Sequence, residues 1–495
     1  MKKNNQLLKK NRQKPLGRFF LSSTLICLCL AFFAISSNAQ VATATINFDQ
    51  PTSITVPKGA FGLNLSAYSS DGTQADQNYR NAISYMKPGL MRCHDWGVMD
   101  QYNGRWGSGW LNGTAWYTPR ISSCVASYKA YNTWGGDMMM NIPSWPKEWN
   151  DGCSDVNCGK LSPAHYTDFY NWCAQLVQIV NIDNNGGIKY WEITNEQDER
   201  YGTNCDELGR IFNGAAAAMK AVDPTIKCGG PAAARGDITA NMDAFFSTAA
   251  PNLDFVSFHS YSTDHASVTS VFKGAVSNGK IVNGVRSEFA KYSTRTIEYF
   301  HNEFNISWAP PDDMMTNDVS LAYDAIFNVT AIKAGCTATN AWNESDGYYG
   351  KCDYSENYSL RPSAYGYHNL NNAGLVGATV CNSTVSNDNK LVVMATVKGD
   401  TAKFVAINRS EADNNFQFSF SGLPAKTSSV FKTVTATNTG GSTTGSVTYG
   451  ELTGGTGIQI KRNEVVIFSI KLGDPVPVTG VTVSPTSDTI DINGR

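Results

Sequence analysis

Between residues 59 and 375, short apolar runs typical of buried strands alternate eight times with longer segments of helical periodicity. The strand-like runs cover residues 61–68, 88–95, 136–145, 188–196, 226–234, 253–261, 297–307 and 336–345. Eight strands with intervening helices over this length predict a (β/α)8 TIM barrel of the α/β class. An open doubly wound sheet is the alternative, but no G-x-G-x-x-G follows any of these runs.

The helices of this region are predicted from their periodicity and their start signals. The longest of them cover residues 162–182, 206–222 and 318–335. Ser162 is expected to cap the first, because Pro163 follows it and proline is favoured at the first helical position.

The first 39 residues have the layout of a secretory signal peptide. Seven of the 40 Lys and Arg residues lie there without any acidic residue, followed by the apolar run 19–36 and small residues at Ser37 and Ala39. We therefore expect cleavage after Ala39 and a secreted bacterial protein, either periplasmic or extracellular. A membrane anchor is the alternative, but Ser and Thr interrupt the run, which is short for a span.

Charge excludes some partners of the mature chain. Removing the seven basic residues takes the net charge from -2 to -9, with 33 basic against 42 acidic residues. This sign argues against a nucleic acid or an anionic membrane surface as a partner. No second long apolar run follows, so we expect no membrane insertion after signal removal.

Ten of the 12 cysteines follow the predicted cleavage site, where an oxidising compartment would permit disulfides. Cys153 and Cys158 share a short polar loop and are the one pair predicted to bridge, since spacing does not decide the other pairings. A metal site is the alternative for these cysteines. No metal is predicted, because neither a C-x-x-C pair nor an H-E-x-x-H helix accompanies them.

The helical period disappears after the predicted barrel. Residues 376–472 are expected to form a β-sandwich, and residues 40–58 to add strands that pack on it. Its predicted strands cover residues 390–400, 402–410, 414–422, 429–438, 445–452 and 464–472. Residues 473–495 are interpreted as a proline-rich linker and the start of a truncated bacterial immunoglobulin-like repeat.

Two of the predicted barrel strands end in Asn-Glu. Alternation along 188–196 puts Glu192, Thr194 and Glu196 on one face, and alternation along 297–307 does the same for Tyr299, His301 and Glu303. An isolated Asn-Glu is more often a surface loop. Two glutamates at the carboxyl ends of separate barrel strands, 107 residues apart, are what glycoside hydrolysis requires.

The segments around these glutamates resemble a known family. "WEITNEQD" (191–198) resembles the Asn-Glu acid/base signature of clan A glycoside hydrolases, retaining enzymes built on this barrel. "FHNEFNISWAPP" (300–311) resembles the nucleophile segment of glycoside hydrolase family 39, the β-xylosidase and α-L-iduronidase family. "MRCHDWGVMD" (91–100), "NIPSWP" (141–146) and "VSFHSY" (256–261) are similar to further motifs of that family. Asp95, Gln197 and Asn302 depart from its pattern, in which Gly, Pro and Thr are usual.

This resemblance implies that Glu196 is the acid/base and Glu303 the nucleophile. Glu196 then needs a raised pKa, whereas Glu303 must stay ionised. Arg92 is the best cation to keep Glu303 charged, although it could instead pair with a structural acid such as Glu192. Tyr261 is expected to donate a hydrogen bond to Glu303.

For the further candidate residues of the site, the motifs leave more than one role open. Asn195 is expected to hold a sugar hydroxyl, while His94 and His259 are either ligands or core hydrogen-bonding groups. Trp342 and Trp145 are expected to stack on sugar rings, with core packing as the alternative.

The expected function is therefore a retaining hydrolase of β-glycosidic bonds, of xyloside type or in a related plant or algal polysaccharide. Its partner is an oligosaccharide or polysaccharide, and no cofactor is expected. One alternative is a non-catalytic carbohydrate-binding or surface protein on the same scaffold. The other is a clan A hydrolase of another family that acts on galactan, glucan or algal glycans.

Overall fold

The computed structural model describes residues 41–65, 75–94, 110–112, 115–116, 118–152, 159–262, 265–423, 430–437 and 441–472. The predicted signal peptide, the Cys153 and Cys158 pair and the predicted tail 473–495 lie outside the described residues. Within them, no helix is both long enough and apolar enough to cross a membrane.

Eight parallel strands close into a barrel in the order β10-β11-β12-β13-β2-β3-β6-β9. In chain order they are β2 (Gly59–Leu65), β3 (Leu90–Cys93), β6 (Asp137–Ile142), β9 (Tyr190–Ile193), β10 (Lys227–Ala233), β11 (Phe255–Tyr261), β12 (Glu298–Asn305) and β13 (Ala338–Ala341). Each lies within or overlaps one of the eight predicted runs, so the predicted TIM barrel is confirmed. Short two-stranded sheets lie in its loops, formed by β4 (Leu111–Asn112) with β5 (Ala115–Trp116), β7 (Asn150–Asp151) with β8 (Lys160–Leu161), and β14 (Cys352–Asp353) with β15 (Ser359–Leu360).

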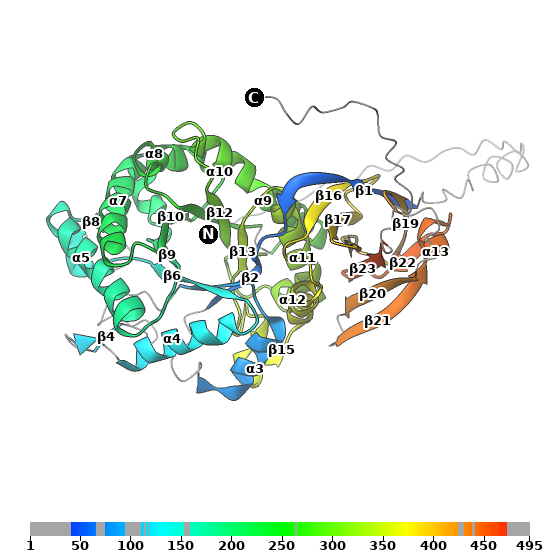
Figure 1. Cartoon of the computed structure of the whole chain (residues 1–495), viewed down its shortest axis with the longest axis horizontal. Coiled ribbons are helices and arrows are strands. Elements are labelled where there is room, and N and C mark those ends of the chain that lie inside the picture. The colour runs from blue at the N-terminus through cyan, green and yellow to red at the C-terminus, as the bar shows by residue number, and fades with distance from the viewer. Residues whose placement is uncertain are drawn as a thin grey trace, which may run out of the picture. The chain divides into compact units, whose positions relative to one another are not determined.

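Helices surround the ring of strands (Figure 1). They are α3 (Gln77–Met86), α4 (Thr118–Asn132), α5 (Tyr166–Val177), α6 (Asp198–Tyr201), α7 (Cys205–Val222), α8 (Thr239–Ala249), α9 (Val268–Gly279), α10 (Ile281–Phe289), α11 (Asp318–Lys333) and α12 (Pro362–Asn372). In α7 the buried residues Leu208, Phe212, Ala215 and Met219 recur at helical spacing, which gives this helix one apolar face toward the barrel.

The start of the α5 region differs from the prediction. Residues Pro163–His165 form a 3₁₀ turn, and the α-helix begins only at Tyr166. The Ser162 side chain makes no capping hydrogen bond; instead its carbonyl accepts from the His165 N–H at 2.9 Å. The tight i to i+3 bond of this turn therefore takes the place of the predicted side-chain cap.

Apolar side chains fill the amino-terminal half of the barrel interior. Leu90, Met139, Phe255, Phe300 and Ala338 form a separate buried cluster there, in which the Phe255 and Phe300 rings stack at 4.8 Å. Beyond this cluster, the buried polar side chains Asn64, Asn141 and Glu303 lie toward the carboxyl ends of their strands. Barrel enzymes carry their chemistry at that end.

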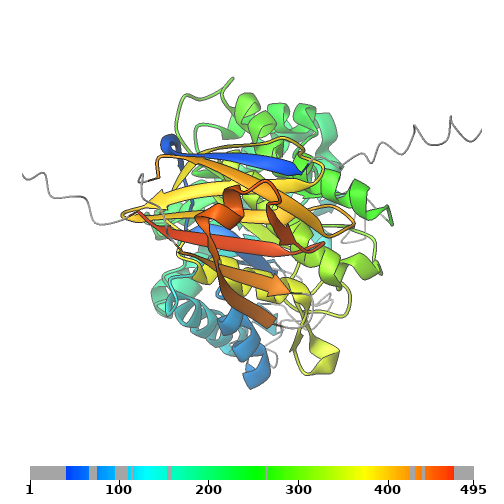
Figure 2. The same cartoon turned by 90° about the vertical axis from the view of Figure 1, so that its right-hand side faces the viewer.

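The remaining strands form one nine-stranded sheet in the order β21-β20-β23-β18-β17-β16-β1-β19-β22. Its strands are β1 (Ala42–Thr55), β16 (Thr379–Val385), β17 (Leu391–Lys398), β18 (Thr401–Asn408), β19 (Asn414–Ser421), β20 (Val430–Thr437), β21 (Gly441–Thr448), β22 (Ile458–Ile460) and β23 (Val465–Lys471). The ring centroids of Phe404 in β18 and Phe418 in β19 lie 5.1 Å apart, although β19 is four places from β18 in the strand order. The sheet therefore folds over onto itself as a sandwich (Figure 2). The N-terminal strand β1 bonds to both β16 and β19.

Two details of this sheet were predicted wrongly. Strands β16 and β22 were missed, and the predicted strand 445–452 ends at Thr448, where helix α13 (Tyr449–Thr453) begins. Thr448 and Glu451 form a capping box, since each side chain bonds to the backbone N–H of the other residue. That reciprocal pair favours a helical turn over continuation of the strand.

Helix α11 is buried nearly all round, because the nine-stranded sheet covers its outer side. Fourteen of its 16 residues are buried, including the polar Asp324 and Asn328. Lys333 at its end donates to the carbonyl of Val393 in β17 at 2.8 Å. A helix covered on both sides needs no polar outer face, which explains why its buried residues occur all round it.

Candidate active site

Strand β9 ends at Ile193, and the chain then turns so that Glu196 lies at the carboxyl end of the barrel. Thr194 and Glu196 adopt left-handed backbone angles, with φ of 72° and 53°. Backbone bonds hold the turn on both sides: the Asn195 N–H donates to Pro143 after β6, and the Glu196 N–H donates to Ala232 in β10. The predicted strict alternation through Thr194 and Glu196 is therefore wrong, because the extended strand has already ended.

Strand β12 contains a bulge at its functional end. His301 pairs with Phe258 of β11 but Glu303 pairs with the next residue, His259, so Asn302 is an extra residue in the ladder. The His301 ring packs against Phe327 of α11, outside the barrel. The predicted shared face of Tyr299, His301 and Glu303 is thus wrong, since the bulge turns Glu303 inward.

Arg92 on β3 connects both glutamate segments and is fully buried. Its Nη1 donates to Oε2 of Glu303 at 3.1 Å, and its Nη2 donates to Oδ1 of Asn195 at 2.6 Å. Its Nε donates to Oε2 of Glu192 at 2.7 Å, and Nη1 also donates to Asn64 at 3.0 Å. One guanidinium therefore pairs both with the structural acid Glu192 and with Glu303.

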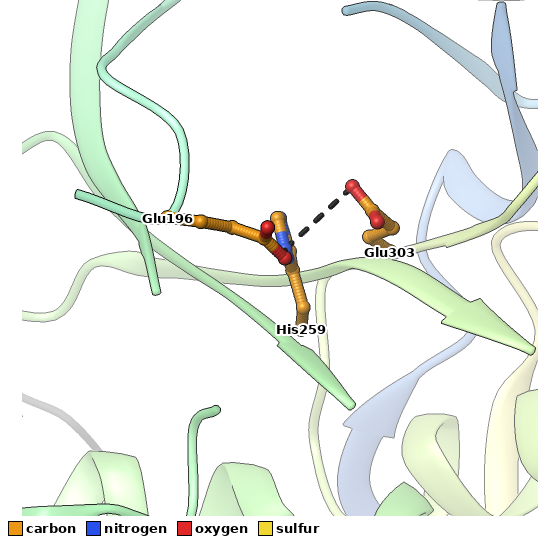
Figure 3. A group of neighbouring side chains, drawn as sticks. All are labelled: Glu196, His259 and Glu303. Atoms are coloured by element: carbon orange, nitrogen blue, oxygen red, sulfur yellow. Dashed lines mark hydrogen bonds and ion pairs between the residues drawn. The ribbon is translucent and has the colours of Figure 1, made fainter. Parts of the chain in front are cut away.

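Two side chains of β11 contact the glutamates. The Tyr261 hydroxyl donates to Oε1 of Glu303 at 2.6 Å. Nδ1 of His259 lies 2.9 Å from Oε1 of Glu196 and 3.6 Å from Oε2 of Glu303. Figure 3 shows the two carboxylates approaching the imidazole from opposite sides. One carboxylate oxygen of Glu196 lies within 4.8 Å of one of Glu303.

The two glutamates meet different electrostatic surroundings. Burial raises the pKa of Glu196, although 35% of its side chain stays exposed. Glu303 is only 9% exposed at its side chain and accepts from both a guanidinium and a phenol. Burial lowers the pKa of His259 to about 4, so its imidazole is neutral near pH 7. Burial lowers the pKa of Arg92, but Glu192 and Glu303 outweigh it and raise the pKa above its usual value.

Glu196, His259 and Glu303 are also the one group among the described residues whose ligand atoms lie close enough to hold a metal ion. The charges around them do not favour this. The Arg92 guanidinium already neutralises Glu303 at 3.1 Å, and a divalent cation beside it would be repelled. The geometry fits proton and nucleophile chemistry better than metal binding.

The predicted aromatic residues separate into two groups. Trp342, at the end of β13, is partly exposed, and its ring meets that of His94 edge to face at 5.3 Å. Trp145 is 2% exposed, packs against Phe169 and Tyr201 and donates from its indole to Asn150. Its predicted role in stacking on sugar is wrong, because the ring is buried in the core.

Three asparagines of the site were not predicted. Asn64 of β2 accepts from Arg92, and its own amide donates to the Asn302 carbonyl at 2.9 Å. Asn141 donates to Oε2 of Glu192 at 2.8 Å, and Asn302 donates to the other oxygen of that carboxylate. The sequence signal that could have identified these three residues is an asparagine near the carboxyl end of an otherwise apolar strand. These amides satisfy the charges that an ion pair between strands would otherwise leave unpaired.

Comparison with known proteins agrees with this geometry. Residues 148–347 match the sequence profile of glycosyl hydrolases family 39. A β-xylosidase of Caldicellulosiruptor saccharolyticus is 29% identical over 152 residues, which are 29% of this chain and 29% of that protein. The chain thus spans less than a third of the length of this curated relative.

Solved structures extend the likeness to the whole fold. The family 39 enzyme of Xanthomonas axonopodis pv. citri superposes with a TM-score of 0.60 at 12% identity, covering 89% of this chain and 99% of that one. A family 51 arabinofuranosidase from the same organism gives a TM-score of 0.65 at 12% identity, covering 87% of this chain and 100% of that one. In its matched segment the chain is therefore similar to the glycosyl hydrolases of family 39, and its fold is that of the solved barrel structures.

Proposed function

We propose that this chain is a secreted, retaining glycoside hydrolase that cleaves β-glycosidic bonds of xyloside type, or those of a related plant or algal polysaccharide. The observation that carries the proposal is the pair Glu196 and Glu303, with carboxylate oxygens within 4.8 Å and with contrasting surroundings. Retaining enzymes hold their two carboxyl groups about 5 to 5.5 Å apart, whereas inverting enzymes need about 6.5 to 9.5 Å to fit a water.

In the first step a carboxylate oxygen of Glu303 attacks the anomeric carbon. The bond from that carbon to the leaving oxygen breaks as Glu196 donates its proton to the oxygen. A raised pKa keeps this proton on Glu196 at a higher pH than an ordinary glutamate would allow. The hydrogen bonds from Arg92 and Tyr261 orient the Glu303 carboxylate for attack.

In the second step Glu196, now ionised, takes a proton from water. The hydroxyl oxygen of that water bonds to the anomeric carbon, and the ester bond to Glu303 breaks. The sugar leaves with its original configuration, and both carboxyl groups return to their starting states. Asn195, held by Arg92 at 2.6 Å, presents its amide beside the site, where it suits a sugar hydroxyl.

The xyloside preference rests on the β-xylosidase that shares 29% identity over 152 residues. Secretion rests on the basic, apolar and small-residue order of residues 1–39. The xyloside preference and secretion are independent of the chemistry of the carboxylate pair. The experiment therefore varies the substrate and the two glutamates separately.

The experiment is a panel of aryl β-glycosides and plant and algal polysaccharides, assayed with wild type, Glu196→Gln and Glu303→Gln, each with and without EDTA. We expect one substrate to be cleaved by wild type and by neither variant, without an effect of the chelator. NMR of the first product should show the β-anomer, and an α-anomer would reject double displacement. Silence across the panel with glycan binding intact would identify a binding protein instead.

A further inference from the structure

Exposed aromatic side chains gather on the two loops that leave β12 and β13. Among the described residues, the large apolar side chains with the greatest exposure are Trp308 at 68% and Tyr348 at 51%. Trp308 follows Glu303 by five residues, and Tyr348 follows Trp342 by six. Both loops leave the carboxyl ends of adjacent barrel strands, so the two rings lie at the end that carries the glutamates.

These loops contact each other and approach the carboxylate site. The Tyr349 hydroxyl donates to the Trp308 carbonyl at 2.7 Å. Tyr261, which donates to Glu303, has a pKa raised by burial and further by Glu303, Glu196 and Tyr349. Tyr349 therefore lies within electrostatic range of Tyr261.

The loop after β13 is held in one conformation by an acidic residue without a role in the proposed chemistry. Oδ1 of the buried Asp346 accepts from the backbone N–H groups of Tyr348, Tyr349 and Gly350 at 2.6, 2.5 and 2.9 Å. Oδ2 accepts from the Asn343 amide at 2.7 Å. Preorganised aromatic rings lose little conformational entropy when they bind a ligand.

The loop is anchored at its far side as well. Arg361 donates to the Gly350 carbonyl at 2.8 Å and forms an ion pair with Asp353 at 2.6 Å. Lys351 pairs with Asp324 of α11 at 2.6 Å, and both side chains are buried. The loop after β13 is thus fixed by two ion pairs and by the Asp346 carboxylate, while the ring of Tyr348 within it stays exposed. A fixed loop with an exposed aromatic ring is typical of a binding surface.

We propose that Trp308 and Tyr348 form an aromatic platform that binds the sugar units of a chain extending beyond the scissile bond. Aromatic faces pack against the apolar faces of sugar rings while the sugar hydroxyls remain in water. A negatively charged mature chain does not suit a polyanion, so the ligand is a neutral oligosaccharide or polysaccharide. This inference rests on the proposed function and makes the enzyme one that prefers chains over single glycosides.

The test compares two substrates of one sugar, beginning with 4-nitrophenyl β-xyloside and xylohexaose and using the matching pair if the panel identifies another sugar. For Trp308→Ala and for Tyr348→Ala, we expect the ratio of KM on the oligosaccharide to KM on the aryl glycoside to rise about tenfold. Tyr292→Ala is the matched control. Tyr292 is also 40% exposed, but it precedes β12 at the opposite end of the barrel, so the ratio should not change.

Binding of xylohexaose to the Glu196→Gln variant, measured by calorimetry, separates this inference from the proposed chemistry. Weaker binding when Trp308→Ala is added would support the platform even if the panel showed no hydrolysis. Equal binding, or a KM ratio equal to that of the Tyr292→Ala control, would overturn it. Absence of hydrolysis by wild type would count against the proposed function alone.

Discussion

Strands β9 and β12 both lead into an Asn-Glu pair, yet the two pairs are placed by different backbone devices. A left-handed turn after β9 presents Glu196, whereas a bulge within β12 turns Glu303 inward. Glu196 keeps 35% of its side chain exposed and meets a neutral imidazole, while Glu303 is nearly enclosed and meets a guanidinium and a phenol. The same dipeptide thus meets different surroundings, because residues on other strands set the environment.

The largest expected effect comes from removing each carboxylate in turn. Glu303→Gln should abolish turnover on every aryl glycoside, since no nucleophile remains. Glu196→Gln should lower turnover by about 10²- to 10⁴-fold on substrates with poor leaving groups, as expected for lost general acid catalysis. It should have much less effect on the first step of a dinitrophenyl glycoside, whose leaving group needs no proton.

Azide provides the control for this assignment. Azide should rescue Glu196→Ala by attacking the glycosyl-enzyme and yielding a β-glycosyl azide. With Glu303→Ala it should yield the α-glycosyl azide, because it replaces the nucleophile. Exchanged products would reverse the roles of the two glutamates.

The next largest effect is expected at Arg92, which donates hydrogen bonds to Glu303 and to Asn195 beside Glu196. Arg92→Met leaves the buried Glu192 carboxylate unpaired, so the free energy of unfolding should fall by about 3 to 5 kcal/mol. It also removes the cation beside Glu303, so kcat/KM of the folded fraction should fall together with stability. Urea unfolding and assays below the melting temperature of the variant measure the two losses separately. Unchanged kcat/KM would leave Arg92 a structural role only.

The sequence predicted the barrel well because each strand is an apolar run bounded by turn residues, a local signal. It predicted Glu196 and Glu303 as strand-end carboxylates for the same reason. The bulge at Asn302 depends on the register between β12 and β11, which no local pattern encodes. The predicted side-chain faces after His301 were therefore wrong, and those after Glu192 were wrong because β9 ends at Ile193 and the chain turns.

Aromatic residues and the nine-stranded sheet show the same limit. Trp145 and Trp342 both lie near strand ends, but only packing by Phe169 and Tyr201 shows that Trp145 belongs to the core. Likewise the N-terminal strand β1 joins β16 to β19 across more than 300 residues, a long-range pairing that periodicity does not predict. Burial and pairing partners are properties of the fold, not of the segment.

A smaller effect is expected on the Glu196 side, at Asp198. Burial raises its pKa to about 6, so the folded state binds this proton more tightly than the unfolded state. The resulting stability is present below about pH 4 and is lost as the pH rises to about 6. Asp198→Asn cannot ionise, so above pH 6 it should be more stable than wild type by up to about 3 kcal/mol.

Melting temperatures of both proteins from pH 4 to 8 measure this difference, which should shrink as the pH falls. Asp206→Asn is a control of opposite sign, because Arg210 lowers the pKa of that exposed carboxyl. A difference between Asp198→Asn and wild type that does not vary with pH would show that the pKa of Asp198 is not shifted by folding within this range.

An effect of similar size is expected on the Glu303 side, at Tyr261. Tyr261→Phe removes one hydrogen bond to the Glu303 carboxylate. The ion pair with Arg92 remains, so the carboxylate keeps part of its stabilisation. A hydrogen bond to a charged group contributes about 1.5 to 3 kcal/mol, which predicts a loss of about 10- to 150-fold in kcat/KM. Tyr190→Phe is the matched control, because that phenol donates to Glu298 at the other end of the same barrel. If Tyr261→Phe kept the wild-type kcat/KM, as the Tyr190→Phe control should, the hydrogen bond from Tyr261 to Glu303 would not contribute to catalysis.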